Sequence, residues 1–193
     1  RVITMDLHAP QIQGFFDIPL DHLYASPILA THYKKKRIRN LAVVSPDVGG
    51  IRLARAYAKR LEAELVLIDK RRPRVNETEV LNIIGDTKGK NVLIIDDIID
   101  TGGTFTRAVQ ALRANGAAEV YGACTHAVLS GNAIERIEKS EVAKITVTDT
   151  IPLKKQSSKI EVQTVSKMFA EAITRSHLNK SISSLFDVDK DKV

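Results

Sequence analysis

A turn of small and polar residues between a predicted strand and a predicted helix constrains this chain most. Residues 91–95 are apolar and largely β-branched, which predicts a buried strand. Two acids, Asp96 and Asp97, stand where this strand is expected to end. Apolar residues then recur at the spacing of one helix face: Phe105, Ala108, Val109 and Leu112. The pattern predicts a strand–turn–helix unit with carboxylates at its rim.

The turn itself, Asp100-Thr101-Gly102-Gly103-Thr104, suits a bound phosphate. Gly102 and Gly103 have no Cβ, so the backbone can approach a ligand closely. The first amides of the following helix lack intrahelical partners and carry partial positive charge, which favours an anion. The hydroxyls of Thr101 and Thr104 add hydrogen-bond donors.

The acids at the end of the strand extend this prediction to a sugar phosphate, because Asp96 and Asp97 can accept hydrogen bonds from ribose hydroxyls. The alternative is a tight turn whose acids only cap the helix. No Gly-Lys-Ser/Thr follows the glycines, and Gly-x-Gly-x-x-Gly is absent. A P-loop and a dinucleotide fingerprint are therefore both excluded.

A second glycine turn, Pro46-Asp47-Val48-Gly49-Gly50, follows a predicted strand at 41–45 and precedes a predicted helix at 53–61. The same reasoning about amides makes it a second anion site, with a plain turn as the alternative. Further strands are predicted at 65–68, 120–124 and 144–147, and further helices at 133–137 and 165–177. The alternation predicts an α/β fold: a parallel β-sheet with helices on both faces, which binds ligands at the carboxyl ends of its strands.

Three charged segments lie outside these units. Asp6 and His8 alternate along an extended run, so both are expected on one side, as metal ligands or as an ordinary hydrogen-bonded pair. The run 70–74 is strongly basic and is expected where the strand at 65–68 ends, as a mobile loop over the phosphate site. The run 34–37 is also basic, and we interpret it as solvated surface.

Composition limits the classes of partner. The 193 residues carry a net charge of +6, which suits anionic ligands, but aromatic residues make up only 5% and supply few stacking platforms for nucleic acid. No apolar run is long enough to span a bilayer. Cys124 is expected to be a buried, unreactive thiol in a reducing compartment. Because Arg1 leads directly into a strand-like run, we expect residues upstream of it to be missing.

The stretch 94–104 resembles the signature of the type I phosphoribosyltransferase fold. Together with residues 6–16 and the run 70–74, it is similar to the ribose-phosphate diphosphokinase family, and the likeness continues to 181–186. This family makes phosphoribosyl diphosphate (PRPP) and has an amino-terminal half that is absent here. The resemblance implies that residues 1–193 form one phosphoribosyltransferase-like domain, the carboxyl-terminal portion of a longer two-domain enzyme, with 1–22 as the segment expected to pack against the missing domain.

The resemblance also implies roles for individual residues. The ribose hydroxyls would be bound by Asp96 and Asp97, and the 5-phosphate by Asp100, Thr101, Gly102, Gly103 and Thr104. The diphosphate loop would consist of Asp47, Val48, Gly49 and Gly50. ATP would be bound by His8, and Mg²⁺ by His8, Asp47 and Asp6. The catalytic residues would be Lys70 and Arg72. Subunit contacts and a regulatory phosphate or ADP site would involve Gln13, Asp21, Ser181, Ser183 and Phe186.

The implied activity is transfer of the β,γ-diphosphate of Mg-ATP to the anomeric hydroxyl of ribose 5-phosphate, giving PRPP and AMP. Two alternatives stay open: a phosphoribosyltransferase that consumes PRPP, and a non-catalytic regulatory homologue. The partners expected are ATP and ribose 5-phosphate, with no nucleic acid and no membrane. The resemblance further implies a cytoplasmic homo-oligomer in which dimers assemble into a hexamer.

Overall fold

The computed structural model describes residues 1–71 and 80–185. Its strands are β1 (Val2–Met5), β2 (Leu20–Leu23), β3 (Leu41–Ser45), β4 (Glu64–Arg71), β5 (Val80–Ile84), β6 (Asn91–Ile99), β7 (Glu119–Ala127), β8 (Val142–Thr148) and β9 (Ile160–Gln163). Its helices are α1 (Ser26–Lys36), α2 (Ile51–Leu61), α3 (Gly103–Ala114), α4 (Ala133–Lys139) and α5 (Ser166–His177), with 3₁₀ turns η1 (Pro10–Phe15) and η2 (Ser183–Leu185).

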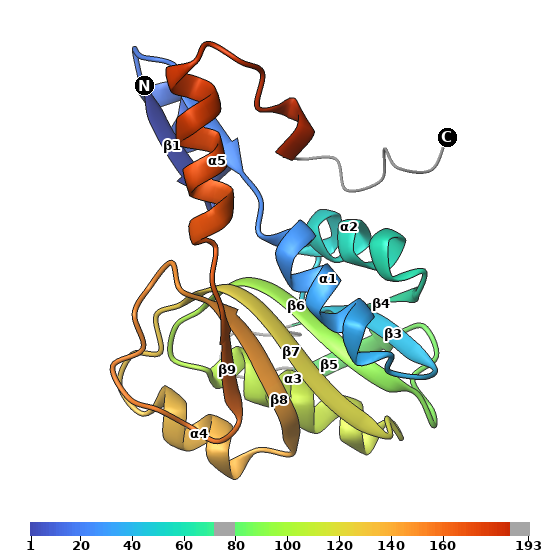
Figure 1. Cartoon of the computed structure of the whole chain (residues 1–193). Helices are drawn as coiled ribbons and strands as arrows, with labels where there is room; N and C mark the ends of the chain where they lie inside the picture. Colours follow the sequence, from blue (N-terminus) through green and yellow to red (C-terminus); the bar gives the residue numbers. More distant parts are fainter. Residues whose placement is uncertain (72–79, 186–193) are drawn as a thin grey trace.

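The main sheet has seven strands in the order β5-β4-β3-β6-β7-β8-β9 (Figure 1). All neighbours are parallel except β5, which pairs antiparallel with β4. The predicted parallel sheet is confirmed, with an antiparallel edge strand that the sequence pattern did not indicate. The short strand β9 at the other edge was not predicted either.

Helices cover both faces of the sheet, as predicted. One core cluster joins the sheet to α3 and α4, and the second joins it to α1, α2 and α5. The four residues predicted to form the inner face of α3 are all buried: Phe105, Ala108, Val109 and Leu112. Cys124 on β7 is fully buried, and burial raises the pKa of its thiol well above the ordinary value. The predicted burial of this cysteine is therefore confirmed, and the raised pKa agrees with an unreactive thiol.

A smaller lobe of β1, β2 and α5 stands beside the main sheet (Figure 1). The strands β1 and β2 form a separate parallel pair, and α5 packs against β1. Arg1 links the lobe through an ion pair of 3.3 Å to Asp21 and a hydrogen bond of 3.2 Å to Ser176. Residues 6–8 follow β1 and lie near the carboxyl ends of the central strands β6 and β7.

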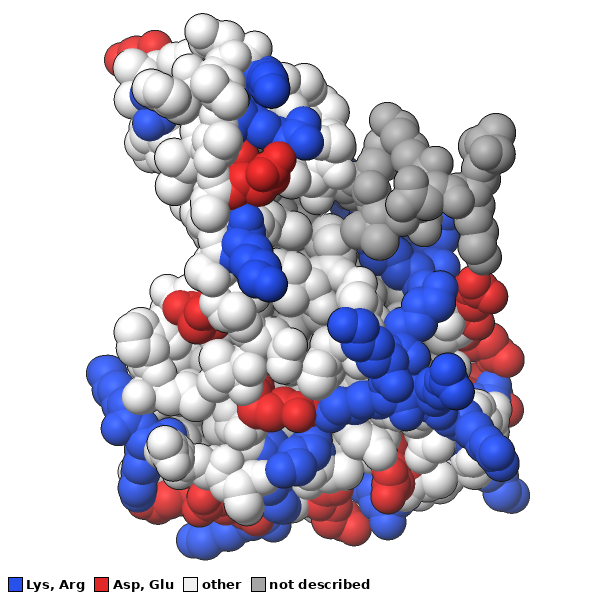
Figure 2. Space-filling view, viewed as in Figure 1, with Lys and Arg blue, Asp and Glu red and all other residues white. Residues whose placement is uncertain are grey.

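The basic run 34–37 belongs to α1, a helix that we did not predict although Ser26-Pro27 is a typical helix start. Its side chains are exposed, which confirms the interpretation as solvated surface, and Figure 2 shows basic atoms gathered over the end of this helix. Lys34 pairs with Glu62 at 3.9 Å, and Lys36 pairs with Glu161. Among the described helices, none is long and apolar enough to cross a membrane.

The close packing of α3 on β7 gives a direct test of the fold. A Cβ added to Gly122 would lie 2.6 Å from Cζ and 2.8 Å from Cε2 of Phe105, a buried core residue. We expect Gly122→Ala to lower the free energy of unfolding by about 1–3 kcal/mol, because the ring must move within a packed core. Urea denaturation measures this change.

The matched control is Gly14→Ala, since a Cβ there meets no atom within 4 Å. It should change the free energy of unfolding by less than about 0.5 kcal/mol. Equal stability of both variants would contradict the packing of Phe105 against Gly122.

Candidate functional site

Two strand–turn–helix units place their turns side by side. The turn 46–50 connects β3 to α2, and the turn 100–102 connects β6 to α3. Because β3 and β6 are adjacent and parallel, with Leu41 opposite Asn91 and Val44 opposite Ile94, both turns emerge at the same edge of the sheet. The prediction that the two turns share one edge is confirmed.

The turn before α3 is open to an anion. Gly102 precedes the helix with φ +71°, a left-handed conformation that favours glycine, and a Cβ there would lie 3.5–3.6 Å from atoms of Ala133. No side chain among the described residues caps the helix. Thr101 and Thr104, the residues on either side of Gly102 and Gly103, are both exposed. The amino-terminal end of α3 can therefore receive a phosphate.

Two residues that follow β7, Ser130 and Arg136, form hydrogen bonds with this turn. The Ser130 amide donates to the carbonyl of Asp100 at 3.1 Å, and the Ser130 hydroxyl bonds to the Asp100 carboxylate. The Arg136 guanidinium donates to the carbonyl of Thr101 at 3.0 Å. Sequence reasoning missed both residues, because only the parallel pairing of β6 with β7 brings the segment to this edge.

The turn before α2 is built differently. The amide of Gly50 donates to Oδ1 of Asp47 at 2.8 Å, and the Ser45 hydroxyl donates to the Asp47 carbonyl at 2.7 Å. A Cβ on Gly50 would lie 3.1 Å from Oγ of Ser45, so the turn is tight, while Val48 is 59% exposed. In this structure the Asp47 carboxylate takes the place that an anion would occupy at the Gly50 amide.

The two acids lie inside β6 rather than at its end. The strand continues to Ile99 because β7 keeps pairing with it, with Asp96 opposite Cys124 and Ile98 opposite His126. Oδ1 of Asp96 accepts a bond of 2.9 Å from the amide of Asp97. Burial, followed by the charges of Asp97 and Asp47, raises the pKa of Asp96 from its ordinary 3.8 to about 7. Near neutral pH this carboxyl can therefore donate as well as accept a hydrogen bond.

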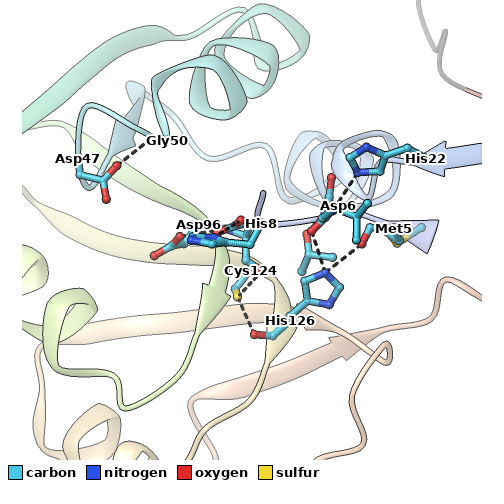
Figure 3. A network of polar contacts seen from close by, with 12 residues as sticks. Met5, Asp6, His8, His22, Asp47, Gly50, Asp96, Cys124 and His126 are labelled. Atoms are coloured by element: carbon cyan, nitrogen blue, oxygen red, sulfur yellow. Dashed lines mark hydrogen bonds and ion pairs between the residues drawn. The ribbon is translucent and has the colours of Figure 1, made fainter. Parts of the chain in front are cut away.

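His8 faces the acids. Its Nδ1 lies 2.8 Å from Oδ2 of Asp97, and its side chain is 72% exposed. The hydrogen bond to Asp97, together with the charges of Asp97, Asp96 and Asp47, raises the pKa of His8. The four side chains therefore form one electrostatic cluster at the mouth of the two turns, as Figure 3 shows for the labelled members.

The prediction that Asp6 and His8 lie on one side is wrong. The strand β1 ends at Met5, and Asp6 has φ +40°, which turns its side chain into the interior. Its Oδ2 accepts bonds from the Ala25 amide at 3.0 Å and the Thr125 hydroxyl at 2.6 Å. Within the described residues no three His, Cys, Asp or Glu side chains form a metal-binding group. The predicted ligands Asp6, His8 and Asp47 thus do not form one metal site, and only His8 and Asp47 remain candidates.

The structure describes only the first two residues of the basic run 70–74. The strand β4 continues to Arg71, so Lys70 pairs with Leu81 of β5 instead of starting a loop, because β5 supplies a partner for the polar end of the strand. Arg72 and the rest of the run to Arg74 lie outside the described residues. The roles of Lys70 and Arg72 remain predictions.

The proposed regulatory residues lie in or next to the smaller lobe. The side-chain nitrogen of Gln13 is 3.1 Å from the Pro10 carbonyl oxygen and 3.2 Å from Nδ1 of His22. Asp21 forms an ion pair with Arg1. Ser181 bonds to Ser183 at 3.0 Å after α5, and Phe186 lies outside the described residues. Within the described part of the chain, no hydrogen bond or ion pair joins Gln13 or Asp21 to Ser181 or Ser183.

Comparison with known proteins identifies the family of this chain. Residues 72–187 match the family model described as the phosphoribosyl synthetase-associated domain. The chain belongs to the phosphoribosyl synthetase family. It is 56% identical over 189 residues to the ribose-phosphate pyrophosphokinase of Chlorobaculum tepidum and 56% identical to that of Bacillus caldolyticus. These matches cover 97% of this chain, but 58% and 60% of the respective relatives.

Solved structures give the same result for the fold. The phosphoribosylpyrophosphate synthetase of Mycobacterium smegmatis superposes with a TM-score of 0.85 at 36% identity, covering 92% of this chain and 58% of that one. The APRTase of Giardia lamblia superposes with a TM-score of 0.52 at 18% identity over 64% of this chain and 75% of that one, a likeness of fold alone. The fold is that of the type I phosphoribosyltransferases, which confirms the resemblance.

The raised pKa of Asp96 predicts how stability depends on pH. The folded chain keeps the proton up to about pH 7, whereas the unfolded chain releases it near the ordinary 3.8, so this group lowers stability as pH rises between these values. Asp96→Asn should remove the effect. The free energy of unfolding of Asp96→Asn minus that of the parent should increase by on the order of 2–4 kcal/mol between about pH 4 and pH 7. Above pH 7 this difference should stay constant.

Chemical denaturation across this pH range measures the difference, with Asp86→Asn as the control. The pKa of Asp86 is lowered, first by the bond from the Lys88 amide, so Asp86 titrates below the ordinary 3.8 and its variant should show a constant difference. A constant difference for Asp96→Asn as well would contradict the raised pKa.

Proposed function

We propose that the chain carries the ribose 5-phosphate site of a ribose-phosphate diphosphokinase. The complete enzyme transfers the β,γ-diphosphate of Mg-ATP to the anomeric hydroxyl of ribose 5-phosphate and releases PRPP and AMP. The observation that carries the proposal is the pair of glycine turns at one sheet edge, with acids and His8 between them. The family membership supports the reaction class.

Ribose 5-phosphate fits the α3 turn. Its phosphate would bind the amides and hydroxyls of Asp100, Thr101, Gly102, Gly103 and Thr104, where the helix end has no side-chain cap. Its ribose hydroxyls would bond to Asp96 and Asp97. Because the pKa of Asp96 is raised to about 7, that carboxyl can either accept from or donate to a hydroxyl near neutral pH.

The diphosphate would bind the α2 turn, at Asp47, Val48, Gly49 and Gly50. A phosphate oxygen there competes with the Asp47 carboxylate for the Gly50 amide. Displaced from the amide, Asp47 becomes available together with His8, the expected contact for ATP. These two side chains would hold Mg²⁺, which needs few protein ligands when phosphates and waters complete its shell. When bound, Mg²⁺ would neutralise charge on the nucleotide phosphates.

The transfer needs no covalent intermediate. The anomeric oxygen forms a bond to the β-phosphorus, and the bond between that phosphorus and the α,β-bridging oxygen breaks. AMP leaves with the bridging oxygen and its electron pair, and the proton of the anomeric hydroxyl passes to solvent. Positioning and charge neutralisation supply most of the catalysis in such reactions. We assign the neutralising charges to Lys70 and Arg72.

Further proposals follow from the family alone. The protein would be a cytoplasmic homo-oligomer in which dimers form a hexamer. The residues Gln13, Asp21, Ser181, Ser183 and Phe186 would take part in subunit contacts and in a regulatory phosphate or ADP site.

A chimera tests the proposed reaction without requiring this chain to act alone. The 189 aligned residues of the Chlorobaculum tepidum relative are replaced by the corresponding residues of this chain. We expect the chimera to release AMP from ATP only when ribose 5-phosphate is present, with PRPP as the second product. Release of diphosphate from PRPP and a base, without AMP formation, would instead indicate a phosphoribosyltransferase, and a folded chimera with neither activity would indicate a non-catalytic homologue.

Two lysine variants of the chimera separate the predicted catalytic charge from a general effect of charge. Lys70→Ala should lower kcat by roughly 100-fold or more, as loss of a charge that stabilises the transition state does. Lys35→Ala, in the exposed run at the end of α1, should leave kcat unchanged. Full activity of the Lys70→Ala chimera would rule out the role assigned to Lys70.

A further inference from the structure

The chain turns sharply at Asp6, two residues before His8, with an unusual backbone conformation. Asp6 adopts φ +40°, a left-handed conformation that is uncommon for any residue except glycine. Such conformations persist only where surrounding contacts enforce them, and they concentrate at functional sites. His8 itself is 72% exposed and has Asp97 as its partner, so its position depends on how the preceding residues are fixed.

His126 of β7 holds the backbone of this turn. Its Nε2 lies 3.1 Å from the carbonyl oxygen of Met5 and 3.1 Å from that of Asp6. Both are acceptors only, so Nε2 must carry a hydrogen and donate it. Its Nδ1 lies 3.0 Å from the hydroxyl of Thr150, which fixes the ring from the other side.

His22 of β2 holds the next residue. The Leu7 amide donates to Nε2 of His22 at 2.9 Å, so this nitrogen must be unprotonated. In the neutral ring the other nitrogen, Nδ1, carries the hydrogen; it lies 3.2 Å from the side-chain nitrogen of Gln13, which is also a donor, so this contact is not a hydrogen bond. Burial lowers the pKa of His22, which favours the neutral ring that the bond from Leu7 requires.

The Asp6 carboxylate completes the set with its bonds to the Ala25 amide and the Thr125 hydroxyl. Three consecutive residues, Met5 to Leu7, are thus bonded from both sides, and Figure 3 shows Asp6 between the two imidazoles. The next residue after this clamped stretch is His8.

We propose that His126 and His22 are positioning residues that form a clamp on residues 5–7 and thereby hold His8 against Asp97. Neither imidazole belongs to the cluster of His8, Asp47, Asp96 and Asp97, so both act through the backbone. The positioning of His8 by the clamp is inferred from the hydrogen bonds given above. The consequence for nucleotide binding rests on the proposed function, because only that function gives His8 a ligand.

The test reads His8 directly in the chain without any ligand. Nuclear magnetic resonance of ¹⁵N-labelled histidine reports the protonation and hydrogen bonding of each ring nitrogen. In the parent, His8 should show a bonded Nδ1, a signal assigned with the variant Asp97→Asn. His126→Leu and His22→Leu should move the His8 signals toward those of Asp97→Asn. His126→Gln, which keeps an N–H donor for the two carbonyls, should restore them at least in part.

The matched control is His32→Leu, which removes another partly buried histidine whose partner, Glu161, lies far from His8 in the sheet order. It should leave the His8 signals unchanged. If both clamp variants fold and keep the parent His8 signals, the proposal is overturned. If His126→Leu does not fold, His22→Leu alone decides, because it removes only the acceptor for the Leu7 amide and the contact to Gln13.

In the active chimera the clamp variants should raise KM for ATP or lower kcat by roughly 10–100-fold, as loss of an orienting contact does. KM for ribose 5-phosphate should change less than KM for ATP, since among the described residues no hydrogen bond joins the clamp to the α3 turn, and the clamp reaches the ribose contacts only through the bond of His8 to Asp97. Altered His8 signals with an inactive parent chimera would refute the proposed function and keep the clamp. Unaltered signals in an active chimera would refute the clamp and keep the function.

Discussion

The parallel pairing of β3 with β6 brings the two glycine turns of the candidate site together. Each strand is followed by a glycine turn and a helix, and the register places both turns at one edge of the sheet. A parallel arrangement requires a long crossover between the strands, so neither turn could reach the other through local structure alone. The helices on both faces supply the burial that makes such a sheet stable, with α3 and α4 on one side and α1 and α2 on the other.

Electrostatics then distinguishes the two turns. The α3 turn presents helix amides that no side chain of the described ranges caps, whereas the α2 turn uses Asp47 to satisfy the Gly50 amide. Burial raises the pKa of Asp96, the charges of Asp97 and Asp47 raise it further, and His8 compensates part of that charge through its bond to Asp97. Ligand hydroxyls on one side and a divalent cation on the other would relieve the same repulsion.

Local patterns predicted the parts of the fold that local interactions determine. The helix face 105–112 and the turn at Gly102 follow from residue spacing and from the absence of a Cβ, and both were predicted correctly. The strand β5 was missed although it is apolar except at Asn82, because this short run follows a long polar stretch of sequence and forms a strand through its pairing with β4. For the same reason β4 was expected to stop before Lys70.

The errors within the site also come from contacts between distant segments. An extended segment predicts that Asp6 and His8 share one side, but the left-handed turn at Asp6 separates them, and no periodicity indicates that turn. His126 and His22 carried no recognisable motif, since their role depends on the smaller lobe meeting β7. Arg136 and Ser130 were missed likewise, because they approach the phosphate turn only through the pairing of β6 with β7.

The central claim is that the amino-terminal end of α3 binds the phosphate of ribose 5-phosphate. Backbone amide resonances of the ¹⁵N-labelled chain, followed during titration with ribose 5-phosphate and with unphosphorylated ribose, test it most directly. Saturable shifts at Thr101, Gly102, Gly103 and Thr104 are expected with ribose 5-phosphate, and far smaller ones with ribose. Saturable binding that leaves these four amides unmoved, or equal shifts with both sugars, would contradict the claim.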